Sequence, residues 1–297
     1  MAMVYGDTVA TGYTSLYAGT HSPSPQLVAM YDIPQDRIYS FTSNKKFKED
    51  LQRCADAFIS GAGKQYIAFR DVQLSRLRLI EHRRSRAEIP AFRFLYDATE
   101  EVLIVKLMPG AHHETANSQF ATMFTVKLVN MGVEHTLWAV GATRLEALTG
   151  RSKEPDGAWR PSTRVLATDW PSLVIEVGVF ESLAQLRTDA HFWLTKSGGQ
   201  TRVVILFAVN MVTREIKIER WQDAPNPRPR RRTSPPQNPT MMQTLTLHDN
   251  GVVIGGPLLI PASKVYDTLP PGIGQNDFTI TAQDLAKYIL RFWVIVG

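Results

Sequence analysis

Two acidic residues far apart in the sequence, Asp156 and Glu176, have the surroundings expected of a metal-binding pair. Asp156 ends the loop Glu154-Pro155-Asp156, and Glu176 interrupts the apolar run 173–177, which indicates a buried strand. A buried carboxylate without a partner carries a large desolvation cost, so Glu176 must be compensated. A divalent cation does this directly, and Mg²⁺ prefers a few carboxylates plus waters and phosphate oxygens. An arginine partner, or exposure on an edge strand, would compensate Glu176 without any catalysis.

The segments around these two residues alternate between strand and helix patterns. The spacing of apolar residues predicts helices over 112–131 and 181–195, and strands over 102–107, 137–141, 173–177, 202–210 and 214–221. This order predicts an α/β protein with a central mixed sheet flanked by helices. A packing helix is expected from Asn44 to the glycines at 61–63, and a hairpin followed by a capped helix is expected near the C-terminal end.

The local sequence around the two acidic residues resembles a known superfamily. Lys-Glu-Pro-Asp at 153–156, Trp-Pro-Ser-Leu-Val-Ile-Glu-Val-Gly at 170–178 and Leu-Arg-Thr-Asp-Ala-His-Phe-Trp-Leu at 186–194 are similar to the PD-(D/E)XK, or restriction-endonuclease-like, nucleases. Within that superfamily they look like uncharacterised fungal members. The resemblance spans roughly residues 92–221 and implies a restriction-endonuclease-like fold with N- and C-terminal extensions.

The resemblance implies a set of metal ligands. Asp156 and Glu176 would bind one or two Mg²⁺ or Mn²⁺ ions, with the carbonyl of Val177 as a further ligand. Glu114, near the start of the first helix, would be the third acidic ligand, although it could equally complement the helix dipole. His113 beside it is expected at the surface. The metal would activate a water for attack on a phosphodiester and neutralise the charge that develops on the phosphate.

One position departs from the superfamily pattern. The pattern has a lysine two residues after the second acidic residue, where alternate strand residues share a face, and this chain has Gly178 there. Lys153 beside the Pro-Asp loop and Arg187 on the following helix are the candidates to supply the missing cation. Arg187 could instead be the partner that compensates Glu176 in a protein that has lost activity.

Two arginine-rich segments could contact nucleic acid. The first lies within 70–86 and the second within the proline-rich stretch 224–240; a solvated basic edge and a flexible linker are the plainer interpretations. The net charge of +5 over 297 residues permits contact with a polyanion without requiring it. The candidate nucleic-acid-binding residues are Arg83, Arg84, Arg86, Arg230, Arg231 and Arg232.

The sequence also indicates the cellular location of the protein. No apolar run is long enough to cross a membrane, the N-terminus lacks a secretory signal pattern, and the single Cys54 can form no internal disulfide. We therefore expect an intracellular protein, cytoplasmic or nuclear. We expect four parts: an extension at 1–91 with a packing helix and a basic segment, a nuclease-like core at 92–223, a linker at 224–240, and a C-terminal hairpin and helix at 241–297 that dock on the core.

Three functions follow from these observations. The first is a metal-dependent phosphodiesterase acting on DNA or RNA, with activity reduced or lost if nothing replaces the lysine absent at Gly178. The second is a catalytically inactive nuclease-fold protein that binds nucleic acid or another protein. The third is an interaction protein whose carboxylates form internal salt bridges. Whether the chain is an enzyme is left open by the sequence, as are the choice of DNA or RNA and the oligomeric state.

Overall fold

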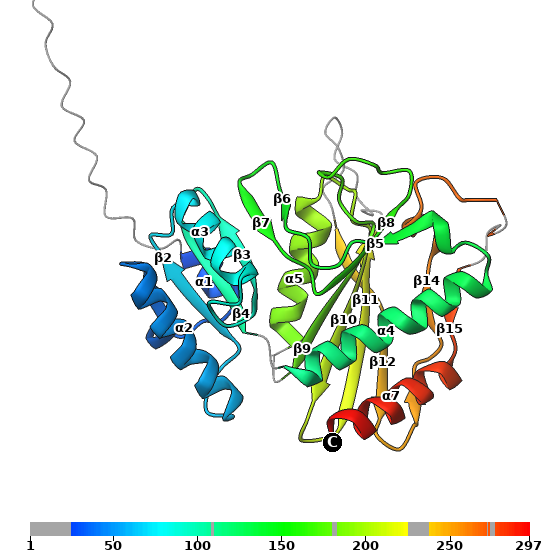
Figure 1. The fold of residues 1–297 in the computed structure, drawn as a ribbon. Helices are drawn as coiled ribbons and strands as arrows, with labels where there is room; N and C mark the ends of the chain where they lie inside the picture. The colour runs from blue at the N-terminus through cyan, green and yellow to red at the C-terminus, as the bar shows by residue number, and fades with distance from the viewer. Residues whose placement is uncertain (1–24, 108–109, 180–182, 225–237, 272, 274–276) are drawn as a thin grey trace, which may run out of the picture.

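The structure is a computed structural model, and it describes residues 25–107, 110–179, 183–224, 238–271, 273 and 277–297. Two large β-sheets lie side by side in it (Figure 1). The first sheet has six strands in the order β1-β2-β4-β3-β7-β6. Its strands are β1 (Ile38–Ser40), β2 (Tyr66–Arg70), β3 (Phe92–Asp97), β4 (Val102–Leu107), β6 (Leu145–Glu146) and β7 (Arg151–Lys153).

The second sheet has seven strands in the order β13-β12-β11-β10-β9-β8-β5. β9 and β10 are parallel and their neighbours are antiparallel, so the sheet is mixed as predicted. The strands are β5 (Leu137–Ala139), β8 (Gly157–Pro161), β9 (Leu173–Val179), β10 (Val203–Asn210), β11 (Glu215–Asp223), β12 (Pro239–His248) and β13 (Val253–Ile254). A separate antiparallel pair is formed by β14 (Leu258–Ile260) and β15 (Phe278–Ile280).

Helices cover both faces of the seven-stranded sheet. α4 (Ala111–Asn130) and α7 (Ala282–Val296) pack their apolar side chains on one face, and α5 (Leu183–Lys196) packs on the other. α5 shares its hydrophobic cluster with residues of the six-stranded sheet, so it lies between the two sheets (Figure 1). The predicted mixed α/β fold with flanking helices is thereby confirmed.

The six-stranded sheet has its own outer layer. α2 (Asn44–Ile59) and α3 (Leu74–Ser85) pack against the face that points away from α5. α2 begins as predicted, because the Ser43 side chain accepts a hydrogen bond from the Lys46 backbone N–H. Four shorter elements are helical: α1 (Pro25–Met30), α6 (Ala262–Val265) and the 3₁₀ segments at Gln35–Arg37 and Glu134–Thr136.

The six-stranded sheet crosses the domain boundary that the sequence suggested at residue 92. β1 and β2 precede that boundary, while β3, β4, β6 and β7 follow it and complete the same sheet. The basic segment within 70–86 is largely the helix α3. Most of the expected linker, including Arg230, Arg231 and Arg232, lies outside the described residues. No described helix is long and apolar enough to cross a membrane.

The C-terminal segment folds as expected. β12 and β13 form the hairpin around Gly251, which adopts the left-handed conformation with φ of +85° that the turn requires. Thr281 and Asp284 form the reciprocal hydrogen bonds of a capping box at the start of α7. The Tyr288 hydroxyl donates to the Ala116 carbonyl of α4 over 3.1 Å, so α7 docks on the core.

Candidate functional site

The two acidic residues singled out by the sequence come together where β8 begins. Asp156 directly precedes β8, and the pairing of Gly157 with Ile175 places it beside the middle of β9, which carries Glu176. The Val177 backbone N–H donates a hydrogen bond to Asp156 Oδ2 over 2.8 Å. Both carboxylates are almost fully buried. The two residues therefore come together as predicted, but between the two sheets and beside the middle of a central strand, where the sequence had suggested the rim of a sheet.

A lysine that the sequence analysis missed lies between the two carboxylates. Lys106 Nζ is 2.9 Å from Asp156 Oδ2 and 3.5 Å from Glu176 Oε2. Lys106 comes from β4 of the six-stranded sheet, and its side chain is only 2% exposed. Its sequence signal is the same as that of Glu176, because it is the one charge in an apolar strand. The ammonium is the one cationic group that contacts both of these buried carboxylates in the described part of the chain, and it helps to compensate them.

Lys153 lies in the same cluster, as expected from its place beside the Pro-Asp loop. Its Nζ is 3.4 Å from Glu176 Oε1 and 2.8 Å from Asp189 Oδ1. The Tyr31 hydroxyl donates to the same Asp189 oxygen over 2.5 Å. Asp189 occupies an inward position of α5 between Leu186 and Trp193, and this spacing was the signal that could have identified it.

Trp193 of α5 also belongs to the site. Its indole N–H donates to Glu176 Oε1 over 2.6 Å, although the sequence indicated only an apolar packing role for this residue. We call the residues Lys106, Asp156, Lys153, Glu176 and Asp189 the buried ionic cluster. Because it draws on β4, β7, β8, β9 and α5, the cluster joins the two sheets.

His113 is buried, and the prediction that it lies at the surface was wrong. Its Nε2 atom is 3.1 Å from Asp156 Oδ2, since the first turn of α4 passes over the start of β8. Glu114 beside it has a 59% exposed side chain, and its Oε1 atom lies 3.6 Å from His113 Nδ1. Glu114 therefore borders the cluster through His113 and makes no direct contact with Asp156 or Glu176 among the described contacts.

A glycine allows α4 to approach the cluster this closely. A Cβ on Gly157 would lie 2.7 Å from Asn117 Oδ1 of α4. Asn117 in turn donates from Nδ2 to the Asp156 carbonyl over 2.9 Å. In the Asp-Gly sequence at 156–157, Asp156 thus supplies the carboxylate of the cluster and Gly157 leaves room for α4 to approach it.

The environment shifts the pKa values of the cluster in different directions. Burial raises the pKa of Glu176 to about 8 in spite of the nearby Lys153. Burial acts on Asp156 in the same sense, but His113 and Lys106 outweigh it and hold the Asp156 pKa well below its usual range. Burial would lower the pKa of His113, yet Asp156 reverses this and raises it. Burial would also lower the pKa of Lys153, but the carboxylates of Asp189 and Glu176 outweigh this effect and raise it. One carboxyl is thus ionised and the other is easily protonated.

Arg187 does not belong to the cluster, which corrects one expectation. Its guanidinium forms two hydrogen bonds with Glu219 of β11, at 2.6 Å and 3.0 Å. That hydrogen bond to Glu219 is the main reason why the pKa of Arg187 is raised. Arg187 therefore neither compensates Glu176 nor supplies the cation missing at Gly178.

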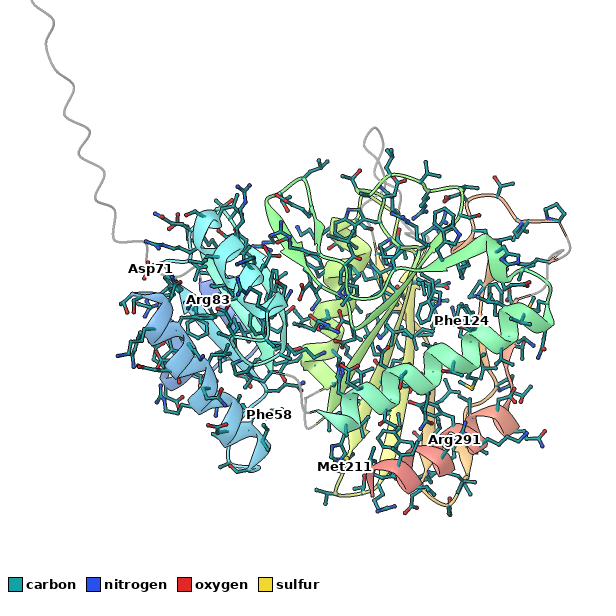
Figure 2. The ribbon with its side chains drawn as sticks, viewed as in Figure 1. Phe58, Asp71, Arg83, Phe124, Met211 and Arg291 are labelled. Atoms are coloured by element: carbon teal, nitrogen blue, oxygen red, sulfur yellow. The ribbon has the colours of Figure 1, made fainter. Side chains whose placement is uncertain are left out.

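Three arginines at the C-terminal end of α3 and just after it form ion pairs. Arg84 donates hydrogen bonds to Glu154 from both Nη1 and Nη2. Its guanidinium is therefore not free to contact nucleic acid, which the sequence had suggested. Arg83 and Arg86 both pair with Glu88, at 3.6 Å and 3.1 Å. Arg84 was therefore wrongly placed in a nucleic-acid-binding strip, while Arg83 lies at the outer side of the six-stranded sheet (Figure 2).

The buried ionic cluster offers few ligands for a metal ion. Among the described residues, no three His, Cys, Asp or Glu side chains come close enough together to hold one ion. Asp156 and Glu176 nevertheless offer two carboxylates around one small volume, and Asp156 Oδ1 is buried without a hydrogen-bond partner among the described residues. This set fits a hard cation that keeps waters and substrate oxygens as its other ligands.

The fold and the site together define a mixed α/β protein with a carboxylate–lysine cluster buried between two sheets. The chain matches no protein-family model, and no curated protein matches it. A solved structure from Anabaena variabilis, described as "a putative nuclease belonging to DUF820", is similar to it at 16% identity with a TM-score of 0.40. The similarity covers 66% of this chain and 91% of the other.

Proposed function

We propose that this chain is a metal-dependent phosphodiesterase of the nuclease class, acting on DNA or RNA. The observation that carries the proposal is that Asp156 Oδ2 and Glu176 Oε2 both contact one buried cationic group, Lys106 Nζ, at 2.9 Å and 3.5 Å. Two carboxylates that share one ammonium are close enough together to share one metal ion. The resemblance of the surrounding sequence to PD-(D/E)XK nucleases supports the same assignment.

Asp156 and Glu176 would hold Mg²⁺ or Mn²⁺. The Val177 backbone N–H points to Asp156, and in an extended strand the carbonyl of the same residue points to the same side, so it is available as a further ligand. When bound, the ion would lower the pKa of a water and offset charge on the phosphate. Asp156 Oδ1 accepts no hydrogen bond among the described residues and has only a distant ion pair with Arg93, which supports this use because a buried acceptor without a hydrogen bond is costly.

Lys106 and Lys153 would supply the positive charge that Gly178 cannot. Lys106 reaches both carboxylates from β4, and Lys153 reaches Glu176 from β7. Asp189 fixes the Lys153 ammonium at 2.8 Å, and Tyr31 orients Asp189. On this proposal the two lysines hold the carboxylates in place and balance the charge of a bound phosphate.

The substrate would reach the cluster from the side of Arg93 and Glu114. Arg93 Nε is 3.8 Å from Asp156 Oδ1, and its side chain is 23% exposed. Glu114 is more exposed still, while the side chains of the buried ionic cluster are nearly inaccessible. Arg93 is therefore the residue we expect to guide a phosphate toward Asp156.

The proposal is tested by a cleavage assay on single- and double-stranded DNA and RNA with Mg²⁺, with Mn²⁺ and with a chelator. Asp156→Asn keeps the shape of the side chain and removes its charge, and we expect it to abolish cleavage. Asp97→Asn is the matched control, because Asp97 is also a buried carboxylate, paired with Arg151 at 2.6 Å outside the cluster. Cleavage that survives in Asp156→Asn but needs metal would reject the assignment.

A second candidate is a non-catalytic protein that keeps the same scaffold for binding. The observation in its favour is that Lys106 and Lys153 already balance the carboxylates, which leaves little uncompensated charge for a metal. Calorimetry with Mn²⁺ separates the two candidates. A heat of Mn²⁺ binding that disappears in Glu176→Gln favours the phosphodiesterase. The absence of a binding heat in the unmodified chain favours the binding protein.

A further inference from the structure

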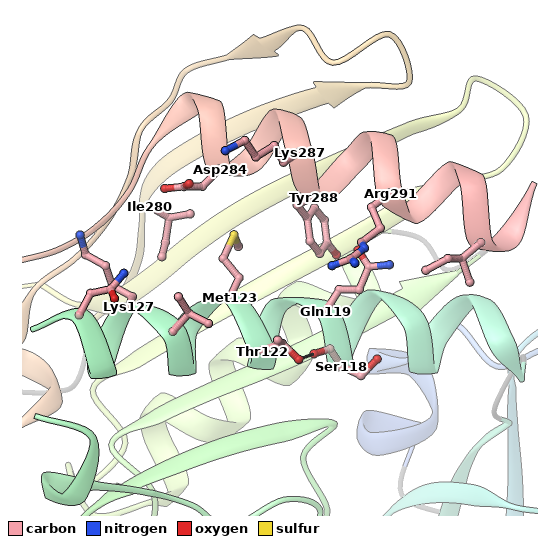
Figure 3. Close-up of a pocket in the computed structure, with 13 residues that line it drawn as sticks. Ser118, Gln119, Thr122, Met123, Lys127, Ile280, Asp284, Lys287, Tyr288 and Arg291 are labelled. Carbon is pink, nitrogen blue, oxygen red and sulfur yellow. Dashed lines mark hydrogen bonds between the residues drawn. The ribbon is translucent and has the colours of Figure 1, made fainter. Parts of the chain in front are cut away.

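A groove runs along the outer surface of the molecule between α4 and α7 (Figure 3). Its volume is about 720 Å³. On α4 the lining extends from Ser118 to Asn130, and on α7 it extends from Asp284 to Ile295. At a rise of about 1.5 Å per residue, both walls are roughly 16–18 Å long, or about three helical turns.

Three cations line the groove without acidic partners. Lys127 comes from α4, and Lys287 and Arg291 come from α7 (Figure 3). In the described part of the chain, none of these side chains forms an ion pair or a hydrogen bond. The lining acid, Asp284, is committed to the capping box, where its carboxylate accepts from the Thr281 hydroxyl over 2.7 Å. The groove therefore carries excess positive charge.

The floor of the groove contains a polar group that lacks a partner. Both amide atoms of Gln119, Oε1 and Nε2, are inaccessible and make no hydrogen bond within the described residues. A buried amide left in this state costs free energy.

Apolar side chains form the rest of the lining. Met123 points into the groove and Ile280 lies across from it (Figure 3). Val126 and Ile295 sit on its two lips and are 52% and 56% exposed. Val129 on α4 is also exposed, so the apolar surface continues beyond the groove itself. The groove thus combines an apolar lining with positively charged side chains.

We propose that this groove binds an acidic amphipathic helix of a partner protein. Its two walls are as long as a three-turn helix, whose apolar residues at positions i, i+3 or i+4 and i+7 would contact Met123 and Val126. Carboxylates flanking that stripe would pair with Lys127, Lys287 and Arg291. The proposal does not depend on the function assigned to Asp156 and Glu176.

Two other occupants fit less well. Single-stranded nucleic acid binds through exposed aromatic rings that stack on its bases, but the aromatic residue of the lining, Tyr288, is buried and its hydroxyl is bonded to α4. A second copy docked through the same face would bring Lys287 and Arg291 of two chains together, and like charges repel.

The test uses the full chain and two fluorescent peptides of about 14 residues, long enough for three to four helical turns. Both carry leucines at helical spacing; one has glutamate and the other lysine at the remaining charged positions. Binding is followed by fluorescence anisotropy. The variant Lys127→Glu/Lys287→Glu/Arg291→Glu reverses the charge of the groove. The control Lys45→Glu/Lys48→Glu/Lys64→Glu makes the same change in charge at exposed residues on or beside α2.

We expect the acidic peptide to bind the unmodified chain and the control at least about tenfold more tightly than the basic peptide. The groove variant should reverse this preference. Val126→Asp, on an exposed lip, should also weaken the acidic peptide about tenfold while the melting temperature stays that of the control. Equal binding of the two peptides, or an unchanged preference in the groove variant, would overturn the proposal. So would displacement of the acidic peptide by a single-stranded oligonucleotide, or a chain dimer that dissociates on charge reversal.

Discussion

Lys106 Nζ lies 2.9 Å from Asp156 Oδ2 and 3.5 Å from Glu176 Oε2, so one residue of the six-stranded sheet holds together the two acidic residues of the other sheet. Without it, the two carboxylates would face each other at the start of β8 with Lys153, His113 and the more distant Arg93 to balance them. Because Lys106 comes from one sheet and contacts carboxylates of the other, the packing of the two sheets determines the charge balance at the proposed site.

Replacing this lysine should destabilise the fold strongly. Lys106→Met keeps the length of the side chain but leaves Asp156 and Glu176 without their shared ammonium. Removing one partner of a buried ion pair costs about 3–5 kcal/mol, and we expect a loss of that size in the free energy of unfolding measured with urea. Lys217→Met, at a side chain that is 44% exposed, is the control and should change it by less than about 0.5 kcal/mol. Equal effects of the two variants would contradict the role of Lys106.

Glu176 should make stability fall as the pH rises. Its pKa is raised from 4.5 to about 8 by burial, so between these values the folded chain keeps a proton that the unfolded chain has released. The unfolded state then binds fewer protons, and the free energy of unfolding decreases with pH across this window. Urea unfolding of Glu176→Gln, which cannot titrate, should show a flatter dependence on pH. A slope identical to that of the unmodified chain would rule out a raised pKa.

Metal binding should release a proton. Below pH 8 Glu176 is largely protonated, and a cation must displace that proton to use the carboxylate. We therefore expect the affinity for Mn²⁺ to increase with pH and about one proton to leave per ion bound. Calorimetry in two buffers with different ionisation enthalpies measures this number directly. Affinity that is independent of pH would argue against Glu176 as a ligand.

Arg84 should matter for stability and Arg86 should not. Arg84 forms a two-pronged pair with Glu154, whose side chain is 5% exposed, whereas Arg86 is largely exposed. Arg84→Ala leaves a buried acceptor unsatisfied, which costs roughly 1–3 kcal/mol, and Arg86→Ala leaves none. Thermal unfolding of the two variants compares them. An unchanged melting temperature in Arg84→Ala would show that the Arg84–Glu154 ion pair does not stabilise the fold.

Much of the second sheet could be predicted from the sequence. The helices now seen as α4, α5 and α7 and the strands β9, β10 and β11 have clear apolar periods, and their local pattern matches their final burial. The convergence of Asp156 and Glu176 was likewise predictable, because the Pro-Asp loop and the β9 carboxylate occur in adjacent strand segments.

The partners of these two residues were harder to predict, for a physical reason. Lys106 and Tyr31 reach the cluster through pairings between distant segments, and no local pattern specifies which strand of one sheet faces which helix of the other. Arg187 was misassigned because it lies on α5 only two positions from Asp189, and two positions on a helix separate its faces. His113 was predicted to lie at the surface because the residues next to it in the sequence do not indicate that α4 packs closely over Gly157.

The most direct test of the central claim is the metal dependence of nucleic-acid cleavage by the unmodified chain, Asp156→Asn and Asp97→Asn, measured together with their thermal unfolding. We predict Mn²⁺-dependent cleavage by the unmodified chain and by Asp97→Asn, and none by Asp156→Asn in its folded state. Cleavage by folded Asp156→Asn at the rate of the unmodified chain would contradict a metal site built on Asp156 and Glu176.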